Sequence, residues 1–209
     1  MRAEPRPSLG RRSSRGGARR AAAAAALAAL LVIAPGVAKS DPNAETLAKC
    51  AACHGPGGNT TVPQFPSIAG QPATFIENQL VIMREGLRDV PAMKEVVAGM
   101  KDEEIVELAK HFAAQPFKPN ARAPDAEKAR LGAEIARARL CSTCHLANYS
   151  GQQQVPRIGG QNEAYLVESM KQFRDNPGPG RDTIMASTLR GLTDADLASL
   201  ANHLANFKP

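Results

Sequence analysis

The pattern Cys-x-x-Cys-His occurs twice in this chain, as "CAACH" from Cys50 and "CSTCH" from Cys141, and no cysteine lies elsewhere. Four kinds of site fit cysteines at this spacing: a zinc site, two dithiol redox motifs, two disulfides or two covalent haem attachments. Only haem attachment uses every residue of the pattern. Two thiols three positions apart near a helix end can reach the two vinyl groups of haem, and the next histidine can ligate the iron.

The other three interpretations each leave part of the pattern unexplained. A zinc site would need both cysteine pairs in one tetrahedral centre and would leave the histidines without a role. A thioredoxin-like motif needs a βαβ context, and plain disulfides do not involve the histidine. The sequence therefore favours two haem sites, which use Cys50, Cys53 and His54, and Cys141, Cys144 and His145.

The chain is a tandem repeat, because residues 42–115 and 133–207 follow one plan at offsets of 90 to 92 positions. Apolar residues recur at spacings of three and four in both closing segments, and no segment alternates as a strand does. These patterns predict an all-α fold. The predicted parts are an export signal (1–40), an N-terminal domain (41–114), a linker (115–124) and a C-terminal domain (125–209).

The linker contains three prolines and is short, so the two domains are expected to pack against each other. We expect that interface to include hydrogen bonds around the haem propionates. A domain of about 80 residues has a small hydrophobic core and usually needs additional stabilisation, which a large buried cofactor supplies.

Residues 1–40 read as an export signal, with seven arginines, an alanine- and leucine-rich run and small residues around Ala38. Retention as an uncleaved anchor is the alternative. The remainder holds 18 basic and 19 acidic residues, so the positive net charge of the whole chain belongs to this segment. The composition therefore gives no support for nucleic-acid binding, and the expected location is the periplasm.

Methionines are the candidates for the sixth iron ligand, since a Met/His pair raises the reduction potential and closes the site. Met93 and Met185 occupy equivalent places in the repeat, in segments expected to be irregular loops. The other methionines of the two repeats align with apolar helical positions and are expected in the core: Met83, Met100 and Met170. His111 and His203 would be needed for a bis-histidine site, but a surface role suits their helix positions better.

Both Cys-x-x-Cys-His patterns, the loops "FPSIAGQ" (65–71) and "VPRIGGQ" (155–161), and the two methionines make the chain resemble a diheme cytochrome c of the cytochrome c4 type. The resemblance implies two class I cytochrome c folds packed around two covalent haem c groups, each with His/Met axial ligation. It also implies that the carbonyls of Pro66 and Pro156 accept hydrogen bonds from His54 and His145.

The same resemblance implies electron transfer. An enzyme in its own right, such as a peroxidase or a thiosulfate dehydrogenase, would need an open or unusual axial site, and the availability of Met93 and Met185, with no spare cysteine as a ligand, argues against it. The favoured function is a carrier between a quinol-oxidising complex or dehydrogenase and a terminal oxidase. The alternative is the dedicated electron-accepting subunit of a periplasmic dehydrogenase, such as one for sulfide or alcohol. In either case the partners are redox proteins, and membrane contact would occur through them or through an uncleaved signal anchor.

Overall fold

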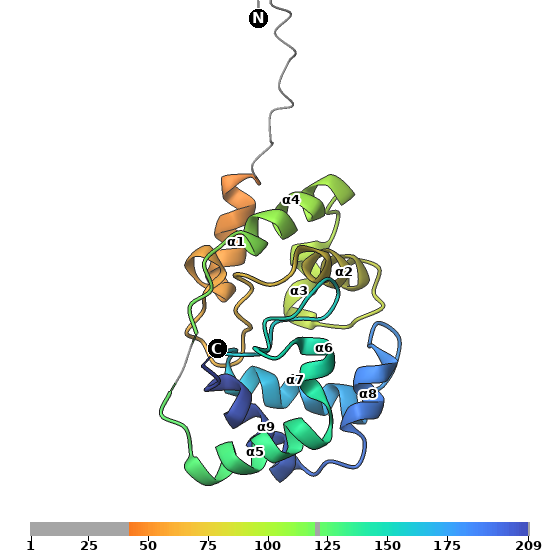
Figure 1. Ribbon diagram of the computed structural model, residues 1–209. Helices are drawn as coiled ribbons and strands as arrows, with labels where there is room; N and C mark the ends of the chain where they lie inside the picture. The colour runs from red at the N-terminus through yellow and green to blue at the C-terminus, as the bar shows by residue number, and fades with distance from the viewer. Residues whose placement is uncertain (1–41, 120–121, 209) are drawn as a thin grey trace, which may run out of the picture. The chain divides into compact units, whose positions relative to one another are not determined.

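Helices form all the regular secondary structure in the part of the chain that is described (Figure 1). The computed structural model describes residues 42–119 and 122–208, all within a unit spanning Lys39–Pro209. Its one β-type contact is an isolated bridge between Gln152 and Val155. The all-α prediction is therefore confirmed, whereas the predicted export signal (1–40) lies outside the described residues.

The first repeat contains four α-helices and one short 3-10 helix. The N-terminal helix carries the first cysteine pattern, and α2 packs against α4 (Figure 1). None of the helices in 42–119 or 122–208 is long and apolar enough to cross a membrane. The elements are α1 (Ala44–His54), η1 (Pro56–Gly58), α2 (Ala73–Arg84), α3 (Pro91–Val97) and α4 (Asp102–Ala113).

The second repeat has the same order of α-helices, except that its first helix is broken in two, and its described residues include no counterpart of η1. Leu140 adopts a left-handed backbone conformation, with φ of 55°, and separates the two pieces. Thr193 and Asp196 form a capping box at the start of the closing helix. The helices are α5 (Ala126–Ala138), α6 (Cys141–His145), α7 (Glu163–Asp175), α8 (Thr183–Leu189) and α9 (Asp194–Ala205).

The two repeats differ in the size of their protein cores. The core cluster of the second repeat contains eleven buried residues, drawn mainly from α7 and α9. The first repeat has four buried residues in its cluster, Ile76, Leu108, Ala109 and Phe112, while Val97 and Ile105 are buried outside it. Apolar burial is the main stabilising term in folding, so the stability of the first repeat depends more on a group other than its own side chains that fills its interior.

Gly132 lets α5 cross α9 at close range, and Figure 1 shows these two helices side by side. A Cβ at Gly132 would lie 2.1 Å from the carbonyl oxygen of Ser199 and 2.7 Å from the Cβ of His203. No side chain fits there without moving the helices apart.

Gly132→Ala is expected to destabilise the second repeat by about 2 kcal/mol, because the added methyl overpacks this crossing by more than helix propensity returns. Guanidinium unfolding followed by circular dichroism measures the change. Gly178→Ala is the matched control, since a Cβ at Gly178 would meet no atom within 4 Å. Equal stability of the two variants would contradict the close crossing.

Contacts with both repeats hold the predicted linker. The Asn59 side chain donates to the Pro116 carbonyl at 3.0 Å and accepts from the Lys118 N–H at 2.7 Å. Phe117 lies against both Gly70 and Gly160, which are equivalent positions of the repeat: its Cβ faces Gly70 and its ring faces Gly160. These contacts support the expected packing of the two domains, while the domain boundaries themselves stay a prediction.

Candidate functional site

The first Cys-x-x-Cys-His pattern occupies the end of α1, so one helix positions all three functional side chains. Gly55 ends this helix with φ of 75°, and a Cβ there would lie 2.1 Å from the carbonyl oxygen of Asn59. Glycine is the residue that such a turn tolerates. The chain therefore turns away directly after His54, whose side chain is buried, with 9% of the residue exposed.

The second pattern forms the separate short helix α6. Left-handed residues flank it on both sides: Leu140 with φ of 55° and Leu146 with φ of 68°. His145 ends this helix as His54 ends α1, and it is equally buried, with 7% exposed. The two histidines thus occupy equivalent places in the two repeats.

Each histidine donates a hydrogen bond to a proline carbonyl, as the family resemblance implied. Nδ1 of His54 lies 2.8 Å from the Pro66 oxygen, and Nδ1 of His145 lies 2.8 Å from the Pro156 oxygen. A carbonyl only accepts, so Nδ1 carries the proton and Nε2 keeps a free lone pair. Within 42–119 and 122–208, neither Nε2 has a hydrogen-bond partner.

Burial sets the protonation of both histidines and of the first cysteine in each pair. It lowers the pKa of His54 and His145 below the ordinary value, and the bond to proline offsets this only in part. Burial likewise raises the pKa of the Cys50 and Cys141 thiols. At neutral pH the site therefore presents neutral imidazoles, which are good ligands for iron, beside protonated thiols.

None of the four cysteines is paired in a disulfide, so the disulfide alternative is not formed. Cys50 borders the core of the first repeat, and Cys141 borders that of the second. Among the described residues, no three histidine, cysteine or acidic side chains lie close enough to hold a metal together. The shared zinc site considered from the sequence is therefore not formed there either.

The two candidate methionine ligands lie on short helices and not in irregular loops, so that expectation was wrong. Met93 lies on α3, which begins at Pro91, a residue suited to the first helical turn. Met185 lies on α8, and the backbone N–H of Met185 donates a hydrogen bond to the Asp182 side chain at 2.8 Å. Both methionines are half-buried.

Two other methionines have the core role predicted for them. Met170 is 4% exposed within the core of the second repeat, and Met100 packs against that of the first. Met185 and Cys141 border the same core cluster, which brings two predicted site residues of the second repeat to one region.

Sequence reasoning missed a pair of arginines that precede the candidate methionines. Nε of Arg88 is buried and has no hydrogen-bond partner among the described residues. Its Nη1 donates to the Gln79 side chain, and Arg181 donates in the same way to Gln172. Burial lowers the pKa of Arg181, and the nearby Arg88 charge lowers it further. The repeated dipeptide Arg-Asp was the available signal.

Two arginines near each other, one with an unsatisfied buried N–H, suit a group that carries carboxylates. Haem carries two propionates, so this pair extends the donor set that the histidines and cysteines provide. The described residues therefore fit haem on three counts: cysteines that form no disulfide, neutral imidazoles with an open nitrogen, and half-buried arginines.

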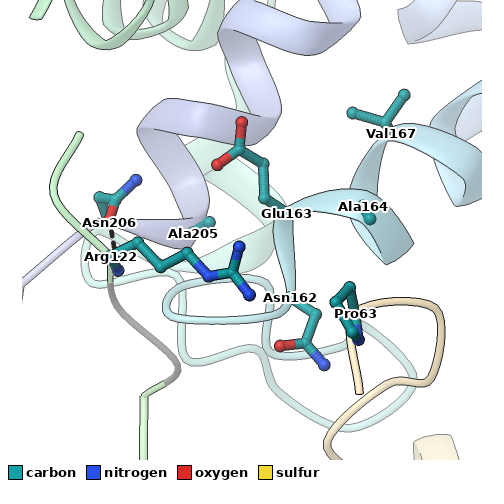
Figure 2. A pocket seen from close by; sticks show the side chains of 8 residues that line it. All are labelled: Pro63, Arg122, Asn162, Glu163, Ala164, Val167, Ala205 and Asn206. Carbon is teal, nitrogen blue, oxygen red and sulfur yellow. Dashed lines mark hydrogen bonds between the residues drawn. The ribbon is translucent and has the colours of Figure 1, made fainter. Parts of the chain in front are cut away.

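Figure 2 shows a surface hollow that is distinct from these residues. Its lining contains no cysteine, histidine or methionine, so it offers no ligand for haem iron. The lining residues are Pro63, Arg122, Asn162, Glu163, Ala164, Val167, Ala205 and Asn206.

Comparison with known families matches the two repeats separately. The family described as "Cytochrome C oxidase, cbb3-type, subunit III" matches residues 39–111, and the family described as "Cytochrome c" matches residues 129–208. Each match includes one Cys-x-x-Cys-His pattern. The repeat is thus a tandem of two cytochrome c domains.

Individual relatives cover nearly all of the repeat. Cytochrome c4 of Thiocapsa roseopersicina is 32% identical, with 77% of this chain and 88% of that protein covered. The "thiosulfate dehydrogenase electron acceptor" of Thiomonas intermedia (strain K12) is 35% identical, with 76% and 78% covered. The crystal structure of reduced recombinant cytochrome c4 from Pseudomonas stutzeri gives a TM-score of 0.72 at 26% identity, with 80% of this chain and 100% of that chain covered.

Two helical domains, each with a buried histidine directly after a cysteine pair, define a tandem c-type cytochrome. The chain belongs to the cytochrome c4 family. It is accordingly a diheme electron-transfer protein and not an enzyme, and it carries two covalently bound haem c groups.

Proposed function

We propose that each cysteine pair forms the two thioether bonds to one haem and that the adjoining histidine ligates its iron. The N-terminal domain (41–114) would use Cys50, Cys53 and His54, and the C-terminal domain (125–209) would use Cys141, Cys144 and His145. Met93 and Met185 are the proposed sixth ligands. The observation that carries the proposal is the buried histidine whose Nδ1 is fixed by a proline carbonyl while Nε2 stays open.

The bound haem supplies a one-electron couple between ferric and ferrous iron. The protein contributes the environment of that couple. The proline carbonyls orient the imidazole rings and increase their basicity through Nδ1, as outer-shell partners of metal ligands do. Arg88 and Arg181 are proposed to hold propionates, which would satisfy the buried N–H of Arg88.

We propose that the protein is a periplasmic electron carrier. It would take electrons from a quinol-oxidising complex or a dehydrogenase and pass them to a terminal oxidase. Residues 1–40, with their basic and apolar segments, support export, and haem ligation at both axial positions suits transfer without a bound substrate.

A second candidate function is favoured by one specific relative. The Thiomonas intermedia protein, 35% identical with 78% of its length covered, is described as a thiosulfate dehydrogenase electron acceptor. The present protein would then accept electrons from one dedicated periplasmic dehydrogenase. Both candidates use the same haem sites, so the partner distinguishes them.

The test is a comparison of electron donors for the purified oxidised holoprotein. Membranes with an active quinol-oxidising complex are expected to reduce both haems on addition of quinol, and oxidase-containing membranes are expected to reoxidise them. Periplasmic extract supplied with thiosulfate, sulfide or an alcohol tests the alternative. Reduction by one such substrate and extract, with no reduction by quinol and membranes, would overturn the carrier function in favour of the dedicated acceptor.

A further inference from the structure

Two glutamines at equivalent positions of the repeat, Gln71 and Gln161, connect the two cytochrome domains. Both side chains are buried, with 4% and 2% of the residues exposed. Each reaches out of its own domain and forms two hydrogen bonds with the backbone of one residue in the other. The sites reached, Ser67 and Arg157, are themselves equivalent in the repeat, so the contact is reciprocal.

The distances within this contact are short and nearly the same on both sides. Gln161 accepts from the Ser67 N–H at 2.8 Å and donates to the Ser67 carbonyl at 2.8 Å. Gln71 accepts from the Arg157 N–H at 2.8 Å and donates to the Arg157 carbonyl at 2.9 Å. A buried amide with a two-point backbone partner is held in one orientation.

These glutamines meet the peptide groups that hold the histidines. The carbonyl of Pro66 accepts from Nδ1 of His54, and the N–H of the same peptide group, on Ser67, donates to Gln161. One planar, resonant amide therefore has the histidine on its oxygen and the opposite domain's glutamine on its nitrogen.

The second domain repeats this arrangement. The carbonyl of Pro156 accepts from Nδ1 of His145, and the N–H of Arg157 in that peptide group donates to Gln71. Hydrogen bonds in such a chain polarise one another, so a good acceptor on the N–H makes the carbonyl oxygen a better acceptor for the imidazole.

We propose that Gln71 and Gln161 are positioning residues that act across the domain interface, each tuning the reduction potential of the haem in the opposite domain. Each glutamine strengthens the Nδ1–H···O=C bond of the other domain's histidine. That bond gives the imidazole more anionic character, which stabilises ferric iron and lowers the potential. The inference rests on the proposed ligation of iron by His54 and His145.

The test uses the full-length holoprotein with Gln161→Met, a change that preserves approximate size and removes both hydrogen bonds to Ser67, together with the one that Gln161 accepts from the Asn162 backbone N–H. The potential of the N-terminal haem is expected to rise, with an increase in its ferrous-to-ferric ratio of about threefold at fixed potential, or ~28 mV at ~59 mV per decade. The C-terminal haem should not change. Gln71→Met is expected to do the reverse. Hyperfine-shifted NMR signals followed through a redox titration report the two haems separately.

A second readout follows the histidine itself. In the reduced protein, the Nδ1 proton of His54 is expected to exchange faster with solvent in Gln161→Met, while that of His145 exchanges at the wild-type rate. Gln161→Glu keeps an acceptor for the Ser67 N–H and is expected not to raise the potential of the N-terminal haem. A rise in this variant would contradict the proposal.

Asn162→Ala is the matched control. The Asn162 side chain also donates across the interface, to the carbonyls of Val62 and Phe65, but it does not bond the peptide group between Pro66 and Ser67. If it shifts the potentials as Gln161→Met does, or if Gln161→Met shifts both haems equally, the glutamines have only a structural role. Wild-type protein without histidine-ligated haem would instead overturn the proposed function, and this inference with it.

Discussion

Replacing Cys50 and Cys53 together by alanine is expected to leave a protein with one haem in place of two. The thioether bonds need both thiols of a pattern, and no other cysteine is present to replace them. Intact mass spectrometry of periplasmic material should show the loss of one haem mass, and the c-type haemochrome absorbance should fall by about half. Cys141→Ala with Cys144→Ala should give the same result for the other haem.

The two double variants should differ in stability. The first repeat has only four residues in its buried core cluster, whereas the second has eleven, so haem supplies a larger share of the first interior. Loss of the first haem is therefore expected to abolish most of the helical circular dichroism of its domain. Loss of the second should leave part of that domain folded at low denaturant.

Ser142→Ala is the control for these variants, because it lies within a pattern but offers no thiol and is exposed. It should retain both haems. Two haem masses in either double variant, or a wild-type mass equal to apoprotein with zinc, would show that the cysteine pairs do not attach haem.

Met93→His and Met185→His are each expected to lower the potential of one haem by ~0.1 V or more, within the ~0.8 V that axial ligands span. Sulfur ligation favours ferrous iron, whereas a second imidazole favours ferric iron. Each change should also remove about half of the weak far-red absorption that marks iron–methionine bonding. Redox titration with optical detection measures both effects in one experiment.

Met100→Leu is the matched control in the first domain, since Met100 packs against the core there. It should leave the far-red band and both potentials at wild-type values. If Met100→Leu removed half of the band while Met93→Leu kept it, Met100 would be the ligand of the first haem and the proposed assignment would be wrong.

Local chemistry made much of this protein predictable from its sequence. Thiols and an imidazole at adjacent turns of one helix end, a proline 12 or 11 residues further on and apolar residues at helical spacing are all short-range patterns. Such patterns determine helix positions, whereas the hydrogen bond from each histidine to its proline was implied by the family resemblance and is present in the structure. The duplication of every pattern then indicated two domains of one kind.

Where the two repeats differ in sequence, tertiary packing determined the backbone conformation. Tyr149 has φ of 53° at the place where the first repeat has Gly58 with φ of 79°. A tyrosine tolerates this conformation because its ring packs edge-on against Phe207 and His203. No local pattern predicts a tyrosine with this conformation. The sequence likewise carries no signal for the break between α5 and α6 at Leu140, which is 68% exposed.

The sequence by itself determined the two sites, their cysteines and histidines and the helical class. Only the tertiary structure decided what joins the sites: Gln71 and Gln161 bond residues 86 and 94 positions away, and Arg88 lies near Arg181. Neither the glutamine contacts nor the proximity of the two arginines follows from a periodic sequence pattern. The residues involved lie close together only when the two domains pack. The physical reason for this difference is the sequence distance over which the interactions act. The residues of each cysteine pattern are neighbours along the chain, whereas the glutamines bond residues of the opposite domain.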